Sequence, residues 1–327
     1  MELHLNYNPP PSPVKISHTD KILLVGSCFA ENIGGKLLES NFNTLVNPNG
    51  ILFNPASILT SLHSYIKAET INPKPEINNN LYHSFQHHGS FSSATKEELE
   101  NKINTSTKTA RQHLKETKFL IITFGSAYVY RHIKTNQIVA NCHKLPQQDF
   151  KKELLSVQEI VSQYNLLLKE LKTFNPNLNI IFTVSPVKYL RDGLIENNLS
   201  KAILLQSVHQ LLTPNSKLSI PNYSYFPAYE LVNDDLRDYR FYKEDMAHPT
   251  EQAINYVWEK FSDVYFSEET KSLLETIQEI NQASLHRPIN ANTEQHRKFK
   301  QIYFQKCSEL EKKHPHLNFS TAKQIFS

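Results

Sequence analysis

The sequence predicts an α/β fold of three layers, in which helices cover both faces of a mostly parallel β-sheet. Apolar runs with the length of a buried strand occur at residues 22–25, 119–124 and 180–184. Between them lie stretches such as 157–171, whose apolar residues recur at helical spacing. Because a crossover helix commonly joins neighbouring parallel strands, this alternation favours a sheet covered on both sides.

The first half of the chain should contain the following elements in order. Residues 1–20 are rich in proline and should lie extended on the surface. A strand at 22–25 and a helix after it lead to a turn rich in Asn, Pro and Gly at 47–55, and then to a helix near 58–66. Residues 69–93 are polar and are expected to form an irregular insertion or a short hairpin, whose length is typical of a functional loop.

The second half continues the alternation. A helix near 95–116 precedes the strand at 119–124, and a Thr135-Asn136 turn between apolar pairs predicts a hairpin. Further helices are expected around 157–171 and 202–212, followed by a last strand at 223–226. The final helix of the domain repeats its apolar residues every three or four positions, at Ile254, Val257, Trp258, Phe261 and Val264.

We expect two structural units. Residues 1–266 should form the α/β domain, and residues 267–327 should form a helical C-terminal appendage of two helices, separated near Pro288. The apolar positions of the appendage are sparse, so its helices must pack on something to be stable.

Composition limits the functional classes. An apolar fraction of 39% and a charged fraction of 20% fit a globular protein. A net charge of +3 with scattered basic residues does not predict nucleic-acid binding. No segment approaches the ~20 apolar residues that cross a bilayer, and the N-terminus lacks a signal-peptide pattern. Three cysteines do not suggest a disulfide framework, so a cytoplasmic protein is predicted; the sequence does not predict its oligomeric state.

Ser27 is the first candidate site residue. It follows the apolar run that ends at Gly26 and precedes residues with helical spacing (Phe29, Ile33 and Leu37). A serine there lies at the carboxyl edge of a sheet, where open α/β sheets bind ligands, and at a helix N-terminus, whose N–H groups stabilise an oxyanion. The alternative is a serine that only caps the helix.

Asp245 and His248 are the second candidate pair. An aspartate three residues before a histidine in a turn can place both side chains on one side of the backbone. The carboxylate can then orient the imidazole, and the imidazole can take a proton from a serine. The alternative is an aspartate that caps the helix after it.

Several ordered motifs carry a resemblance to a known family. Gly26-Ser27-Cys28-Phe29-Ala30 is the five-residue signature that gives the GSCFA domain family its name, and the resemblance spans roughly residues 20 to 265. The other motifs that match are Asn47-Pro48-Asn49-Gly50-Ile51-Leu52-Phe53-Asn54-Pro55, Asn141-Cys142-His143-Lys144, Ser185-Pro186-Val187 and Glu244-Asp245-Met246-Ala247-His248-Pro249.

The GSCFA family in turn resembles the SGNH (GDSL-like) hydrolases, which implies a flavodoxin-like α/β/α fold. By this likeness Ser27 is the nucleophile and first oxyanion donor, and Gly50 is the second donor. Asp245 and His248 complete the triad. Those hydrolases usually carry Gly-x-Asn-Asp after their third strand, whereas this chain has Gly125-Ser126-Ala127-Tyr128. The third oxyanion donor is therefore missing from its usual place.

Two other assignments compete at these motifs. Cys28 could be the nucleophile, because a helix N-terminus lowers the pKa of a thiol, although it lies one position further into the turn. Cys142 and His143 could bind zinc with Asp245 and His248, but no familiar ligand spacing is present. We prefer that Asn141 and His143 line the mouth of the site, with Asn141 as a replacement donor. Alternatively, Asn141 only ends the hairpin.

Basic and aromatic side chains should surround this edge of the sheet. The basic ones could bind an anionic substrate group, although solvated surface is the simpler interpretation. The aromatic ones could line an apolar cleft or pack in the core. The basic residues are Lys188, Arg191, Arg237 and Arg240, and the aromatic residues are Tyr225, Phe226, Tyr229, Tyr239, Phe241 and Tyr242.

The sequence therefore predicts a serine esterase or O-acyltransferase with a Ser27, Asp245 and His248 triad. Its partner would be a small-molecule or carbohydrate ester, and neither a cofactor nor a metal is expected. The alternative is a protein that keeps the fold and binds a ligand or carbohydrate with little or no turnover, since fold alone does not establish activity.

Overall fold

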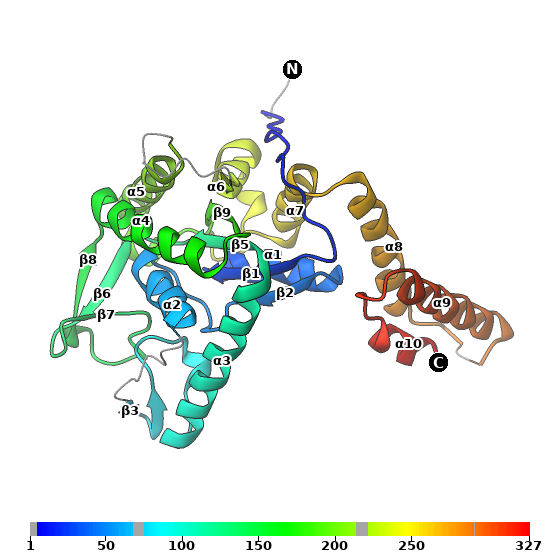
Figure 1. The fold of residues 1–327 in the computed structure, drawn as a ribbon, viewed down its shortest axis with the longest axis horizontal. Coiled ribbons are helices and arrows are strands. Elements are labelled where there is room, and N and C mark those ends of the chain that lie inside the picture. Colours follow the sequence, from blue (N-terminus) through cyan, green and yellow to red (C-terminus); the bar gives the residue numbers. More distant parts are fainter. Residues whose placement is uncertain (1–4, 68–74, 214–221, 291) are drawn as a thin grey trace.

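The computed structural model describes residues 5–67, 75–213, 222–290 and 292–327. Figure 1 shows a central sheet between layers of helices, with the last helices set to one side. The sheet has five parallel strands in the order β10-β9-β5-β1-β2. The strands are β1 (Lys21–Gly26), β2 (Asn43–Val46), β5 (Thr117–Phe124), β9 (Asn179–Val184) and β10 (Tyr223–Tyr225). The predicted fold class is confirmed.

The order of the strands locates the place where a ligand would bind. Along the chain the sheet grows from β1 to β2 in one direction, and then from β5 to β9 and β10 in the other. The direction reverses between β1 and β5, which pair in register from Ile22 opposite Phe119 to Gly26 opposite Thr123. Open α/β sheets bind ligands at the carboxyl ends of the strands at such a reversal. Ser27 and Gly125 follow the two strands at this point.

Side chains alternate between the two faces of the sheet, and each face has its own core. Leu23 and Val25 of β1 pack toward α2 (Pro55–Lys67), α3 (Lys96–Glu116), α4 (Val157–Phe174) and α5 (Leu194–Leu212). Ile22 and Leu24 pack toward α1 (Cys28–Glu39), α6 (Ala228–Glu230), a π-helical turn at Leu231–Leu236 and α7 (Glu251–Tyr265). One core lies on each face of the sheet, so the domain has three layers: helices, sheet and helices.

Two small antiparallel sheets extend the domain. The predicted hairpin is β6 (Tyr128–His132) with β7 (Gln137–Val139), and β6 also pairs with β8 (Phe150–Leu154). Within 69–93 the expected short hairpin is β3 (Glu76–Asn78) with β4 (Leu81–His83), while residues 68–74 lie outside the described chain. Strand β8 was not predicted from the sequence, because three of its five residues are charged and its apolar pattern is weak.

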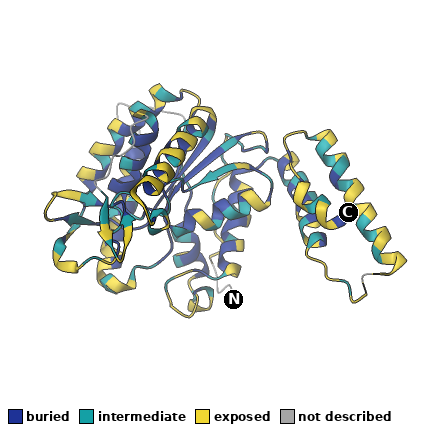
Figure 2. Ribbon diagram, turned by 90° about the horizontal axis from the view of Figure 1, so that it is seen from below, coloured by how far each residue is buried: buried dark blue, intermediate teal, exposed yellow. Residues whose placement is uncertain are grey.

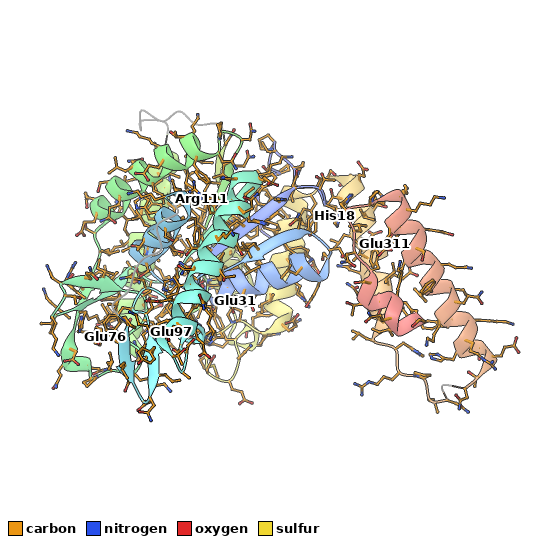
Figure 3. The ribbon with its side chains drawn as sticks, turned by 60° about the horizontal axis from the view of Figure 1, so that its bottom comes forward. His18, Glu31, Glu76, Glu97, Arg111 and Glu311 are labelled. Atoms are coloured by element: carbon orange, nitrogen blue, oxygen red, sulfur yellow. The ribbon has the colours of Figure 1, made fainter. Side chains whose placement is uncertain are left out.

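The C-terminal residues form α8 (Glu268–Ser284), α9 (Glu294–Lys313) and α10 (Ser320–Phe326), so a short third helix follows the two expected ones. Ile277, Cys307 and Phe326 belong to a core that these helices share among themselves. Figure 2 shows the helices beside the sheet, and in Figure 3 His18 lies on the side of the α/β core nearest to them. The division into units at residue 266 stays a prediction.

Several short 3₁₀ turns connect these elements. They lie at Gly89–Phe91, Gln147–Asp149, Leu190–Asp192 and Tyr239–Phe241. No helix in the described part of the chain is both long enough and apolar enough to cross a membrane.

Candidate active site

The turn after β1 is built so that Ser27 begins a helix at the edge of the sheet. Gly26 has φ +143°, and a Cβ atom there would lie 2.2 Å from the Thr123 carbonyl oxygen, so only glycine fits. Ser27 is the N-cap of α1, and its Oγ accepts a hydrogen bond of 3.3 Å from the Phe29 amide. Its side chain is buried. The helix cap that was the alternative role for Ser27 is therefore present, and because Oγ acts in it as an acceptor, the hydroxyl proton is still available for donation.

The loop after β2 also holds this turn in place, through hydrogen bonds to Gly26. The Asn47 side chain accepts a hydrogen bond from the Gly26 amide at 2.9 Å, and the Gly26 carbonyl accepts one from the Leu52 amide at 2.9 Å. Gly50 lies within the same loop with φ +77°, and a Cβ atom there would come within 2.2 Å of the His88 Cβ atom. The loop therefore needs glycine at this position.

Both predicted backbone donors already have acceptors. The Ser27 N–H donates to the Thr123 carbonyl oxygen at 3.2 Å, and the Gly50 N–H donates to the Asn47 carbonyl oxygen at 2.7 Å. The roles of Ser27 and Gly50 as oxyanion donors stay predictions. Each amide would have to share its hydrogen with the oxyanion or give up its present acceptor.

Asp245 and His248 form a pair within a tight turn. The Asp245 Oδ2 and the His248 Nδ1 lie 2.6 Å apart, and the Asp245 Oδ1 accepts the amides of Ala247 and His248 at 2.9 Å each. The amide of His248 is the main reason that the pKa of Asp245 falls to about 2, and the amide of Ala247 and the His248 ring add to it. The carboxylate therefore stays charged near neutral pH and orients the imidazole.

This pair lies at the same edge of the sheet as Ser27. The Lys188 amide, which follows β9, donates to the Ala247 carbonyl oxygen at 3.1 Å, so the turn is attached at the carboxyl end of β9. Ser27 lies at the carboxyl end of β1, two strands away. Among the described residues no hydrogen bond joins Ser27 to His248, so the structure pairs two of the three predicted triad members.

Gly125, Tyr189 and Lys201 were not predicted as site residues from the sequence, yet Gly125 and Tyr189 lie near Ser27 and Lys201 is hydrogen-bonded to Gly125. A Cβ atom on Gly125 would lie 2.4 Å from the Tyr189 hydroxyl oxygen and 3.2 Å from the Ser27 Cβ atom. Lys201 is buried on α5, and its Nζ donates to the carbonyl oxygens of Gly125 and Ser185 at 2.7 Å each. The only sequence signal was a lysine on the helical face that also carries Leu204 and Val208.

Lys201 joins the ends of two central strands. Gly125 follows β5 and Ser185 follows β9, so one ammonium group fixes both loops. Burial lowers the pKa of Lys201 to about 7. The lysine is thus a structural tie at the base of the candidate site.

Asn141 and His143 pack against the segment 82–93. The Asn141 Oδ1 accepts the His143 amide at 2.8 Å, and its Nδ2 would be 3.8 Å from a Cβ atom on Gly89. The His143 Nε2 lies 2.7 Å from the Ser84 carbonyl oxygen, and burial lowers the pKa of His143. In the described chain no hydrogen bond links either residue to Ser27, so their place at the mouth of the site stays a prediction.

The cysteines do not favour a thiol nucleophile. Burial raises the pKa of the Cys28 thiol, and burial raises that of Cys142 to about 11, so both thiols stay protonated near neutral pH. In the residues that the structure describes, no three His, Cys, Asp or Glu side chains converge as metal ligands would.

The predicted basic residues at this edge mostly have partners. The Lys188 Nζ lies 4.2 Å and 4.0 Å from the ring centres of Tyr239 and Tyr242. Arg191 donates to the Tyr130 hydroxyl at 2.9 Å, and Arg240 pairs with Asp238 at 2.9 Å. These contacts explain Lys188, Arg191 and Arg240 as parts of the surface architecture.

Several solved structures are similar to this chain. One is an acetyl xylan esterase (Est2A) from the rumen bacterium Butyrivibrio proteoclasticus, with a TM-score of 0.41 and 10% identity over 76% of this chain and 64% of that one. Another is a family 3 carbohydrate esterase from Clostridium thermocellum, with a TM-score of 0.35 and 10% identity over 79% of this chain and 98% of that one. This chain thus spans less than two thirds of the first protein.

A third similar structure is a family two carbohydrate esterase from Clostridium thermocellum in complex with cellohexaose, with a TM-score of 0.33 and 12% identity. The similarity covers 78% of this chain and 64% of that one. No curated protein matches the sequence.

Family profiles cover most of the chain. The profile of the GSCFA family matches residues 21–261, which include Ser27, Gly50, Asn141, Asp245 and His248. The profile described as "GSCFA domain protein, C-terminal domain" matches residues 277–327. The chain therefore belongs to the GSCFA family.

Proposed function

We propose that this protein is a serine-dependent esterase or O-acyltransferase in which Ser27 is the nucleophile, His248 the general base and Asp245 the residue that orients His248. The observation that carries the proposal is the 2.6 Å contact between the Asp245 Oδ2 and the His248 Nδ1, at the sheet edge where Ser27 begins α1. An imidazole held through Nδ1 presents Nε2 as the acceptor for a serine proton.

The first half of the reaction forms an acyl-enzyme. The Ser27 Oγ attacks the carbonyl carbon of an ester, and His248 takes the hydroxyl proton as the new C–O bond forms. His248 then returns this proton to the leaving alcohol as the tetrahedral intermediate collapses. Charge on the carbonyl oxygen develops beside the N-terminus of α1, whose dipole favours a negative charge.

The second half frees the serine. Water gives hydrolysis, and another alcohol gives acyl transfer; in both cases His248 removes a proton from the attacking group and returns it to Ser27. Because Ser27 is buried, a substrate reaches its Oγ only after neighbouring side chains move. The proposed substrate is a small-molecule or carbohydrate ester, and the proposed place of action is the cytoplasm.

A binding protein with little or no turnover is the second candidate function. The burial of Ser27 and the acceptors already held by its amide and that of Gly50 are the observations that favour it. Both candidates would bind an ester in the same place, so the covalent step separates them.

Labelling with a fluorophosphonate probe tests the proposal. The full chain should form a covalent adduct that peptide mass spectrometry locates on Ser27. Cys28→Ala should still be labelled, and Ser27→Ala should not. A chain that binds ester analogues but forms no adduct would support the binding protein instead.

A further inference from the structure

The hydroxyl group of Tyr189 is a buried polar group that the fold does not use. Its oxygen is shielded from solvent and has no hydrogen-bond partner among the described residues. A buried donor left without an acceptor costs about 1–3 kcal/mol. Such a group needs a reason to be retained, and a ligand atom that takes the missing place is one.

This hydroxyl group is close to Ser27. The position that a Gly125 Cβ atom would occupy is 2.4 Å from the Tyr189 oxygen and 3.2 Å from the Ser27 Cβ atom. Any residue other than glycine at 125 would collide with the phenol. Gly125 therefore allows the hydroxyl to approach the serine turn, at the loop where the related hydrolases carry their asparagine.

The two backbone donors predicted from the sequence and the donors of the loop after β5 are engaged. The amides of Ser27 and Gly50 donate to carbonyl oxygens. In the loop after β5, the amide of Gly125 donates to the Phe53 carbonyl oxygen at 2.8 Å, and the Ser126 Oγ contacts the Tyr128 amide at 3.1 Å and the Ser200 Oγ at 3.3 Å. Among the described residues, the Tyr189 hydroxyl has no such acceptor.

We infer that Tyr189 is a catalytic residue whose hydroxyl donates a hydrogen bond to the oxyanion formed when Ser27 attacks the acyl carbonyl. The inference rests on the proposed function and supplies the donor missing after β5. The phenol keeps its proton throughout, so the proton of Ser27 still passes to His248 and the balance of the reaction is unchanged. Burial, aided by nearby Cys28 and Asp192, raises the pKa of Tyr189, which preserves a neutral donor.

The surroundings of Tyr189 hold the phenol in place before substrate arrives. Its amide donates to the Asn197 Oδ1 at 2.9 Å, and its ring meets the Phe53 ring edge-on with centres 5.7 Å apart. The Lys201 Nζ lies 5.3 Å from the centre of the Tyr189 ring. A donor fixed in this way needs little reorganisation when charge develops, which is the property of an effective oxyanion site.

The test compares Tyr189→Phe with the unmodified full chain, using p-nitrophenyl acetate as the substrate and recording kcat, KM and the melting temperature. This change removes one oxygen and keeps the ring. We expect kcat to fall ~10²–10³-fold with little change in KM, as for the loss of one oxyanion donor. The melting temperature should not fall, because the hydroxyl has no hydrogen-bond partner in the described structure to lose.

Tyr265→Phe is the matched control. The Tyr265 hydroxyl is also buried, but it lies 3.0 Å from the Ser224 Oγ. Its removal should lower the melting temperature and leave kcat unchanged. The opposite effects of the two Tyr→Phe changes separate a catalytic hydroxyl from a structural one.

Three results would overturn the inference. If Tyr189→Phe keeps the kcat of the unmodified chain while Ser27→Ala is inactive, the proposed function stands and Tyr189 is not the donor. If Asn141→Ala instead shows the ~10²–10³-fold loss of kcat, Asn141 is the third donor. If Ser27→Ala retains full activity, or the chain neither hydrolyses the ester nor reacts with a fluorophosphonate, both the inference and the proposed function fail.

Discussion

The two ends of the proposed catalytic machinery are built in different ways. Ser27 is buried, and backbone hydrogen bonds from β5 and from the loop after β2 hold its turn. The side chains of His248 and Asp245 are 47% and 51% exposed, and a turn of four residues holds them mainly through its own amides and one carboxylate. Ser27 is held by the sheet, whereas the Asp245–His248 pair is held mainly by local hydrogen bonds.

This contrast predicts different behaviour of Ser27 and of the Asp245–His248 pair when a substrate binds. A turn locked into the central strands keeps its geometry, but a buried hydroxyl cannot meet substrate without movement nearby. An exposed pair can reorient at small cost, because few contacts bind it to the core. We therefore expect substrate binding to uncover Ser27 and to bring the imidazole to it.

The largest expected effect on activity comes from substitution of the buried Ser27. Ser27→Ala should abolish ester hydrolysis, because burial raises the pKa of the neighbouring Cys28 thiol and keeps it a poor nucleophile. Its free energy of unfolding should fall by at most about 1 kcal/mol, since the hydroxyl acts only as a helix cap. Rates and chemical denaturation of the two proteins measure both quantities. Activity that survives in Ser27→Ala and disappears in Cys28→Ala would move the nucleophile to the thiol.

The exposed end should matter nearly as much for turnover. His248→Ala should lower kcat about as far as the loss of the serine, because members of a triad act as a unit. Asp245→Asn should be milder but still severe, since the imidazole loses its orienting carboxylate. Steady-state kinetics with and without a chelator check this, and activity lost with the chelator would favour a metal site instead.

The sequence predicted the sheet and the serine turn well, because both depend on local patterns. The apolar run before Gly26 and the helical spacing after Ser27 are readable without any tertiary contact. The Asp245 and His248 pair was also readable, since three residues separate its members. The apolar spacing over 202–212 predicted a helix next to Lys201, but it did not predict the role of this lysine.

The parts that were missed depend on contacts across the chain. Tyr189 comes near Ser27 because β5 lies between β9 and β1 in the sheet, and the need for glycine at 125 becomes clear only from the phenol beside it. The hydrogen bonds that engage the Gly50 and Ser27 amides are likewise tertiary or loop contacts. No spacing in the sequence encodes them.

A third prediction concerns the stability of the buried end. Lys201→Met should lower the free energy of unfolding by about 2 kcal/mol or more, because the carbonyl oxygens of Gly125 and Ser185 both lose their donor. Urea denaturation at pH 7 measures the difference. Lys172→Met on α4 is the control, because it makes the same substitution at an exposed lysine. It should change the free energy of unfolding little.

The same lysine gives a prediction on pH. The pKa of Lys201 is about 7 in the folded protein and close to 10.5 when unfolded, so between these values the unfolded chain binds more protons and stability rises with pH. The difference in stability between the unmodified chain and Lys201→Met should therefore grow from pH 7 to pH 10. Equal differences at both pH values would contradict this account.

The smallest effect is expected from the exposed carboxylate. The folded pKa of Asp245 is about 2, below its ordinary value of 3.8, so the stability that its charge adds is present above pH 4 and is lost as the pH falls toward 2. The difference between the unmodified chain and Asp245→Asn should be small and should shrink over this range. Denaturation midpoints at pH 5 and pH 3 compare the two proteins.

The central claim is that Ser27 and the Asp245–His248 pair act as one unit although no hydrogen bond joins them in the described structure. The rate at which a fluorophosphonate labels Ser27 in the unmodified chain, compared with the rate in His248→Ala, measures this coupling directly. We predict a single adduct on Ser27 that forms at least ~10²-fold more slowly in the variant, in line with the contribution of a general base. Equal labelling rates in the two proteins, or an adduct on another residue, would contradict the claim.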